Sequence, residues 1–157
     1  MPISKKLTKL LEEKKIKYEP IEHRTVYTAY DKAATLKIPE KIVGKTLTVK
    51  LDKNYGLVLI PANKNLDKAK FKKIAKVKSV DFAKEVWIKK NLKGVKVGAV
   101  PPLGNLWKLP TFIDRFLMNQ SKIIINGGDY NWSIKINSAV LKKIIPDLIT
   151  GGLTKPR

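Results

Sequence analysis

The segment VGAVPPLGN holds the residues best suited to chemistry in this chain. Glycine lets the backbone approach a ligand closely and proline fixes φ, so such a loop can hold main-chain amides in place before a ligand arrives. Amides held in this way can stabilise a carbonyl oxygen that becomes an oxyanion. Pro101 and Pro102 have no N–H group, which leaves Gly98, Ala99 and Val100 as donors. The same composition also suits a stiff connection between a helix and a strand.

Lys45 is the second candidate, and it lies in the β-branched run GKTLTVKL. Side chains alternate along a strand, so Lys45 shares a face with the apolar residues Leu47, Val49 and Leu51. An ammonium group buried there must be paired, neutralised or bound to a ligand, because burial alone costs several kcal/mol. At the end of a strand the side chain can instead extend into water.

The content of histidine and cysteine limits the classes of active site and metal site that this chain can form. The chain has one histidine, His23, and no cysteine, which excludes disulfides, thiolate metal sites and cysteine nucleophiles. Zinc hydrolases and Ser-His-Asp enzymes are disfavoured because they use imidazole as ligand or base. We expect no metal and no cofactor. His23 can itself be a general base, or a surface residue that makes a hydrogen bond, which is the commoner role of a lone histidine.

The charge of the chain predicts a polyanionic partner. Thirty-three Lys and Arg residues against 13 acidic ones give a formal net charge of +20. Nearly all the cations are lysines, which attract a phosphate backbone but do not read guanine edges as the fork of arginine does. Lysine enrichment also accompanies thermophily, which is the alternative explanation.

The segment MPISKKLTKLLEEKK lacks the apolar run of a signal peptide, and no stretch reaches the ~18 apolar residues of a membrane span. We therefore expect a cytoplasmic protein without a membrane partner.

Periodicity predicts the elements that must position these residues. Ser4 can cap the first helix, and Thr28 with Asp31 can cap the second. Gly127 and Gly128 predict a tight turn with φ > 0. The expected helices are 3–17, 28–36, 66–76, 81–94 and 138–145, and the expected strands are 18–22, 45–51, 55–61, 111–114, 123–126 and 133–137. The fold class is α+β (mixed α/β), in a single domain over residues 1–157.

The order of several segments resembles the YbaK and prolyl-tRNA-synthetase-associated editing domain family. These segments are EHRTVYTAYDKAA, VGKTLTVK, LVLIPANKNLDKAKF, VGAVPPLGN, and FIDRFL followed by IIINGG. The strongest matches are Lys45 and the loop from Gly98 to Pro102. The resemblance implies a twisted mixed sheet, partly barrel-like and flanked by helices, with a cleft for the terminal adenosine of transfer RNA and its aminoacyl ester.

The activity implied by the resemblance is hydrolysis of a wrongly attached amino acid from transfer RNA, with alanine or cysteine on tRNA(Pro) as the family's commonest substrates. Lys45 would anchor the terminal adenosine or the ester, while the amides of Gly98, Ala99 and Val100 would hold the ester carbonyl for attack by water. The implied substrate-binding residues are Tyr27, Thr46, Pro101, Pro102, Asn126, Gly127 and Ser133. Asn126 and Ser133 stand where some members carry a serine and an aspartate. The expected partners are transfer RNA and a synthetase.

Two other hypotheses stay open. One is a noncatalytic tRNA-binding or synthetase-docking module of the same fold, and the other is a small-molecule binder whose basic surface reflects composition alone. Turnover of mischarged transfer RNA separates an enzyme from both. RNA affinity at low salt then separates the two binders.

Overall fold

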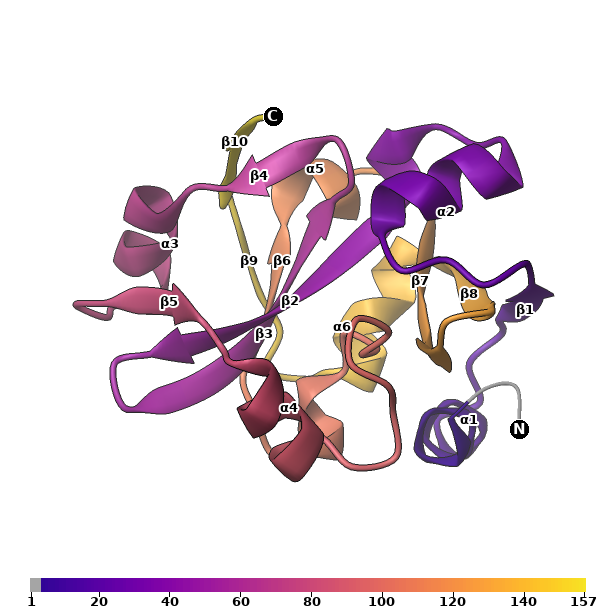
Figure 1. Ribbon diagram of the computed structural model, residues 1–157, viewed down its shortest axis with the longest axis horizontal. Helices are drawn as coiled ribbons and strands as arrows, with labels where there is room; N and C mark the ends of the chain where they lie inside the picture. Colours follow the sequence, from indigo (N-terminus) through magenta and orange to yellow (C-terminus); the bar gives the residue numbers. More distant parts are fainter. Residues whose placement is uncertain (1–3) are drawn as a thin grey trace.

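The computed structural model describes residues 4–157, which form a mixed α/β fold (Figure 1). The larger sheet has five strands in the order β5-β2-β3-β6-β9, the second has the order β1-β8-β7, and β4 pairs with β10. The strands are β1 (Glu19–Glu22), β2 (Gly44–Leu51), β3 (Asn54–Pro61), β4 (Lys64–Leu66), β5 (Val80–Phe82), β6 (Thr111–Asp114), β7 (Lys122–Asp129), β8 (Trp132–Asn137), β9 (Ile149–Gly151) and β10 (Thr154–Pro156). The larger sheet is open, with β5 and β9 at its edges, so the expected mixed sheet flanked by helices is confirmed.

Short helices lie around these sheets (Figure 1). They are α1 (Lys5–Glu13), α2 (Ala29–Leu36), α3 (Lys68–Ala75), α4 (Glu85–Asn91), α5 (Arg115–Met118) and α6 (Leu141–Ile144), with 3₁₀ turns η1 (Glu40–Ile42), η2 (Gly104–Leu106) and η3 (Ser138–Val140). Among residues 4–157, no helix combines the length and the apolar character needed to cross a bilayer.

The β2–β3 hairpin is the centre of the larger sheet. Its register runs from Gly44 opposite Pro61 to Leu51 opposite Asn54, close to the two expected strands. Just before β2, an isolated parallel bridge joins Val43 to Ile124 of β7 and brings the two sheets together. The start of β2 therefore lies beside β7, where the cavity described below is found.

The hydrophobic core is divided among the two sheets and their helices. Val49 and Leu51 belong to a buried cluster with Phe71 of α3, so the apolar face expected for β2 is confirmed. A second cluster places Leu7 and Leu11 of α1 against β7, β8 and α6. A third, smaller cluster packs α2 over the junction of the two sheets, through Ala33, Val43, Ala62 and Ile124.

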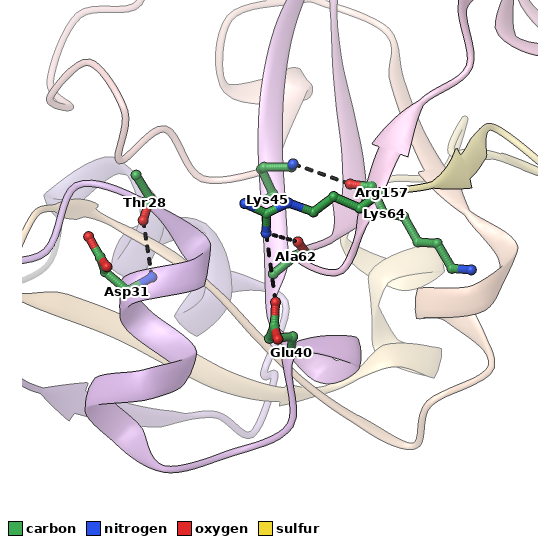
Figure 2. A network of polar contacts seen from close by, with 7 residues as sticks. All are labelled: Thr28, Asp31, Glu40, Lys45, Ala62, Lys64 and Arg157. Carbon is green, nitrogen blue, oxygen red and sulfur yellow. Dashed lines mark hydrogen bonds and ion pairs between the residues drawn. The ribbon is translucent and has the colours of Figure 1, made fainter.

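The caps expected for the first two helices have different outcomes. The hydroxyl of Thr28 accepts a hydrogen bond from the amide of Asp31 at 3.0 Å, which confirms the cap of α2 (Figure 2). Ser4 is the residue before α1, yet its hydroxyl makes no capping bond. Its amide instead donates to the carbonyl of Gly127 at 2.9 Å, so Ser4 fastens α1 to β7. The part of this expected helix before Ser4 lies outside the described residues.

Two further expectations were wrong in detail. The helix expected over 81–94 begins only at Glu85, because Val80 to Phe82 pair with β2 as strand β5. The tight turn expected at Gly127 and Gly128 is absent, since both lie inside β7 at a register shift between Asn126 and Asp129. Only Gly128 of this pair has positive φ, at +97°, and a Cβ there would lie 2.7 Å from the Cβ of Ser4.

Candidate functional site

A cavity of about 190 Å³ lies where α2, the start of β2 and the β7–β8 turn meet the loop from Gly98 to Pro102, which we call the proline loop. We call it the Lys32 cavity. It is lined by α2 and the residues before it, by positions 44–46 and 98–99, and by Asn126, Asp129 and Tyr130. An engineered cavity of ~150 Å³ binds benzene, so this one suits a group about the size of an amino-acid side chain.

Lys32 is the buried cation of this cavity, with only 6% of its surface exposed. The helical spacing of Ala29, Ala33 and Leu36 places it on the inner face of α2, and Nζ donates to Oδ1 of Asn126 at 2.6 Å. Among residues 4–157, no carboxylate lies within ion-pair distance of Lys32. Burial lowers its pKa from 10.5 to about 8. The amine is therefore largely charged at neutral pH while one side-chain amide oxygen is its bonded acceptor.

Asn126 connects Lys32 to the proline loop. Because its Oδ1 accepts from Lys32, its Nδ2 is the donor that reaches the carbonyl oxygen of Val100 at 3.0 Å. The residue itself is buried and lies directly opposite Ser133 in the β7–β8 ladder. One amide side chain thus links α2, β7 and the loop.

Lys45 borders the Lys32 cavity, but its amine is engaged elsewhere. Nζ donates to the carbonyl oxygen of Lys64 at 3.3 Å, on the side of β2 opposite to Thr28 in Figure 2. Burial, and then the charge of Arg157, lower the pKa of Lys45. On that side Lys45 also lines a larger groove of about 540 Å³, together with Phe82 and β4, which we call the Phe82 groove. Lys45 therefore lies between the Lys32 cavity and the Phe82 groove.

The proline loop presents part of its backbone to the cavity. Gly98 and Ala99 line it, with φ of +87° at Gly98, whereas Val100, Pro101 and Pro102 are buried and do not. The expectation that all three loop amides are free donors is wrong for Ala99, whose amide donates to the carbonyl of Lys96 at 3.0 Å. The amide of Gly98 has no partner among residues 4–157.

Two tyrosines and an aspartate form another part of the wall. Tyr27 is 67% exposed and meets Tyr130 edge to face, with ring centroids 4.8 Å apart. Asp129 lies beside them and pairs with Lys96 at 3.0 Å. On β2, Thr46 also lines the cavity, and its hydroxyl is buried without a hydrogen-bond partner in the described part of the chain.

His23 and Ser133 form a polar pair that does not line the cavity. Nδ1 of His23 lies 2.8 Å from the carbonyl oxygen of Arg24 and must donate to it. Nε2 then accepts from the hydroxyl of Ser133 at 2.9 Å. Burial above all, with the nearby charge of Lys32, lowers the pKa of His23, which favours this neutral form. Ser133 is fully buried, so it is held away from any ligand in the cavity.

A family model described as an aminoacyl-tRNA editing domain matches residues 23–144. The chain belongs to this family. The resemblance seen in the sequence is thereby confirmed. The matched region contains every residue that lines the Lys32 cavity.

Solved structures share the fold of this editing domain. A hypothetical protein, APE2540, superimposes with a TM-score of 0.86 at 21% identity, covering 96% of this chain and 100% of its own. A protein from a study of epitope backbone grafting by computational design gives a TM-score of 0.82 at 19% identity, covering 100% and 99%. A candidate trans-editing enzyme for prolyl tRNA synthetase gives 0.81 at 20% identity, covering 99% and 98%.

In this editing domain, the residues expected from the sequence divide into two groups. Those that line the Lys32 cavity are Tyr27, Lys45, Thr46, Gly98, Ala99 and Asn126. Those that do not are Val100, Pro101, Pro102, Gly127 and Ser133. The described residues hold no group of three or more histidine and acidic side chains placed to bind a metal ion.

Sequence reasoning missed Lys32, Asp129 and Tyr130. A signal for Lys32 was available, because Ala29, Ala33 and Leu36 mark the inner face of a helix that also contains it. No comparable signal existed for Asp129 and Tyr130, whose positions depend on the bulge in β7.

Proposed function

We propose that this editing domain hydrolyses the ester bond of mischarged aminoacyl-tRNA. The observation that carries the proposal is that Lys45 and the free amide of Gly98 border one cavity of about 190 Å³. That volume suits an aminoacyl group but is below the 300–1,000 Å³ typical of pockets for whole drug-sized ligands. The nucleoside would therefore lie outside the cavity, toward Lys45 and the Phe82 groove.

The reaction proposed is addition of water to the ester carbonyl. The Gly98 amide would donate to the carbonyl oxygen as it becomes an oxyanion, and Lys45 would anchor the sugar and phosphate of the terminal adenosine. The carbon–oxygen bond to the ribose then breaks. The free amino acid leaves as its carboxylate, and the ribose hydroxyl recovers a proton that the attacking water loses. A neighbouring ribose hydroxyl of the substrate would assist, since His23 does not line the cavity.

Membership of the editing family and the likeness to a candidate trans-editing enzyme for prolyl tRNA synthetase support alanyl- and cysteinyl-tRNA(Pro) as the first esters to test. Editing answers a physical limit, because one methylene contributes only ~1–3 kcal/mol to discrimination by a synthetase pocket. Transfer RNA is the proposed partner, and the excess of lysine supports attraction to its backbone. A synthetase is a second proposed partner.

A noncatalytic tRNA-binding or synthetase-docking module is the second candidate function. It is favoured by the amine of Lys45, which is bonded to Lys64, and by the loop amide of Ala99, which is already occupied.

The test is the lifetime of a panel of mischarged transfer RNAs with and without the protein. We expect faster deacylation with the wild type, and at least a tenfold loss in Lys45→Ala, equivalent to about 1.4 kcal/mol. Lys50→Ala is the matched control, because Lys50 is an exposed lysine on the same strand. Ester lifetimes unchanged by the wild type, with RNA binding retained, would instead establish the noncatalytic module.

A further inference from the structure

The charge of the Lys32 cavity has no counter-ion in the described part of the chain. Lys32 is buried, its amine carries three donors, and one of them is used by Asn126. A buried ammonium group is retained when something pairs with it, and here the cavity itself is the remaining neighbour. The cavity therefore adjoins a cation with two donors that have no acceptor in the described part of the chain.

The carboxylate in the cavity wall does not supply that acceptor. Asp129 is paired with Lys96 at 3.0 Å, and burial alone accounts for the lowered pKa of Lys32. Thr46 lines the same wall, and its buried hydroxyl also has no hydrogen-bond partner among residues 4–157. The alanyl and cysteinyl esters that family membership supports would leave Lys32 without that acceptor, because their side chains carry no oxygen.

We propose that the Lys32 cavity selects an aminoacyl group with a carboxylate side chain, aspartyl or glutamyl. The carboxylate would accept from the two remaining donors of Lys32 and form the buried ion pair that the chain leaves incomplete. Asp129, at the wall with Tyr27 and Tyr130, would meet the α-ammonium group of the same ester. This inference rests on the proposed function, because it assigns the amino acid to that reaction.

Asn126 is a positioning residue in this scheme. It fixes the amine of Lys32 through Oδ1 and the proline loop through Nδ2, so the cation and the Gly98 amide keep a constant separation. An ester whose side chain reaches Lys32 would thereby present its carbonyl to Gly98.

The experiment compares the esters of aspartate, asparagine, alanine and leucine on one chemically acylated transfer RNA. For the wild type we expect kcat/KM for the aspartyl ester to exceed that for each of the others by at least tenfold. Lys32→Met keeps the length of the side chain but removes its charge, and should lose the aspartyl preference while gaining on the leucyl ester. Lys41→Met removes an exposed lysine near α2 and should leave the order unchanged.

Three results would overturn the inference. Equal rates for the aspartyl and asparaginyl esters would show that charge is not read. A preference for the alanyl ester in the wild type would exclude an acidic substrate. A uniform fall of all four rates in Lys32→Met would assign Lys32 to support of the loop alone.

A binding measurement keeps the inference separate from the proposed function. Should no ester be hydrolysed, the probes are 3′-amino-adenosine amides of aspartate and alanine, which cannot be cleaved as esters. Tighter binding of the aspartyl amide, lost in Lys32→Met, would sustain the selectivity while the hydrolase proposal fails. Equal binding of the two amides would overturn the inference as well.

Discussion

Nζ of Lys32 and Oδ1 of Asn126 lie 2.6 Å apart, although the two residues are separated by 94 positions in the sequence. The bond joins α2 to β7 at the wall of the cavity, and Asn126 also donates to the carbonyl of Val100. A buried cation, an amide and a stiff loop thus form one connected unit. The consequences can be measured in the free energy of unfolding, in hydrogen exchange of the loop amides and in the rate of deacylation.

The first prediction concerns the pH dependence of stability. The pKa of Lys32 falls from 10.5 to about 8 on folding, so between these values the unfolded chain binds more protons and stability rises with pH. Lys32→Met should lack this rise. We expect the unfolding free energy of the wild type to rise by about 2–3 kcal/mol relative to that of the variant from pH 7 to pH 10, measured by urea denaturation.

The comparison between variants isolates Lys32, because the two proteins differ only at that position. The other titratable groups around the cavity are His23, Lys45, Asp129, Tyr27 and Tyr130. Of these, His23 feels the charge of Lys32, but its pKa is lowered from 6.5 and therefore lies below the range from pH 7 to pH 10. Parallel stability curves for the two proteins over this range would contradict a buried, charged Lys32.

The second prediction concerns Asn126→Ala. The variant loses the acceptor of Lys32 and the donor to Val100, and a buried group left unsatisfied costs about 1–3 kcal/mol. We also expect faster hydrogen exchange at the amides of positions 97–100, which the side chain fastens. Unaltered exchange there, with stability lost, would mean that the loop is held by other contacts.

The third prediction concerns Gly98, the loop glycine with positive φ. Gly98 has φ of +87°, and a Cβ there would meet its nearest atom, on Tyr130, at 3.6 Å. Gly98→Ala therefore places alanine in a backbone conformation that costs about 1–2 kcal/mol, although the added methyl group meets no close contact. If its amide is the oxyanion donor, displacement of the backbone should slow deacylation by ~10²-fold or more.

Gly94→Ala is the matched control, because Gly94 has φ of +90° and lies outside the Lys32 cavity. This variant should lose a similar amount of stability and keep the wild-type rate of deacylation. Equal rates in Gly98→Ala and Gly94→Ala would remove Gly98 from the chemistry.

The fourth prediction concerns Ser133, which the sequence placed among the substrate-binding residues. It is fully buried and bonded to His23, so Ser133→Ala should cost about 1 kcal/mol of stability and leave kcat/KM within about twofold. Thermal denaturation and the deacylation assay measure the two effects. A large loss of rate at unchanged stability would return Ser133 to the substrate.

The parts of the fold that depend on local pattern were predictable from the sequence. The β2–β3 hairpin, the Thr28 cap and the apolar face of β2 follow from alternation and from capping chemistry. The three-residue strands β4, β5, β9 and β10 do not, because each is defined by a partner distant in the chain. The two glycines in β7 suggested a turn, yet close packing against Ser4 explains Gly128.

The candidate functional site was predictable from the sequence to a similar extent. Lys45 and the loop stand out by residue type and were found beside one cavity. Lys32 is one lysine among many in a basic chain, so composition concealed it. Its importance depends on burial and on Asn126, and both are properties of tertiary packing.

Lys45 borders both hollows, whereas Lys32 borders only the smaller one. If the Phe82 groove holds the nucleotide as proposed, replacing the β2 lysine should disturb nucleotide and aminoacyl binding together. A replacement on α2 should alter the aminoacyl cavity alone. Position 32 is then the place at which this scaffold could be changed to accept another amino acid while its affinity for the nucleic acid is kept.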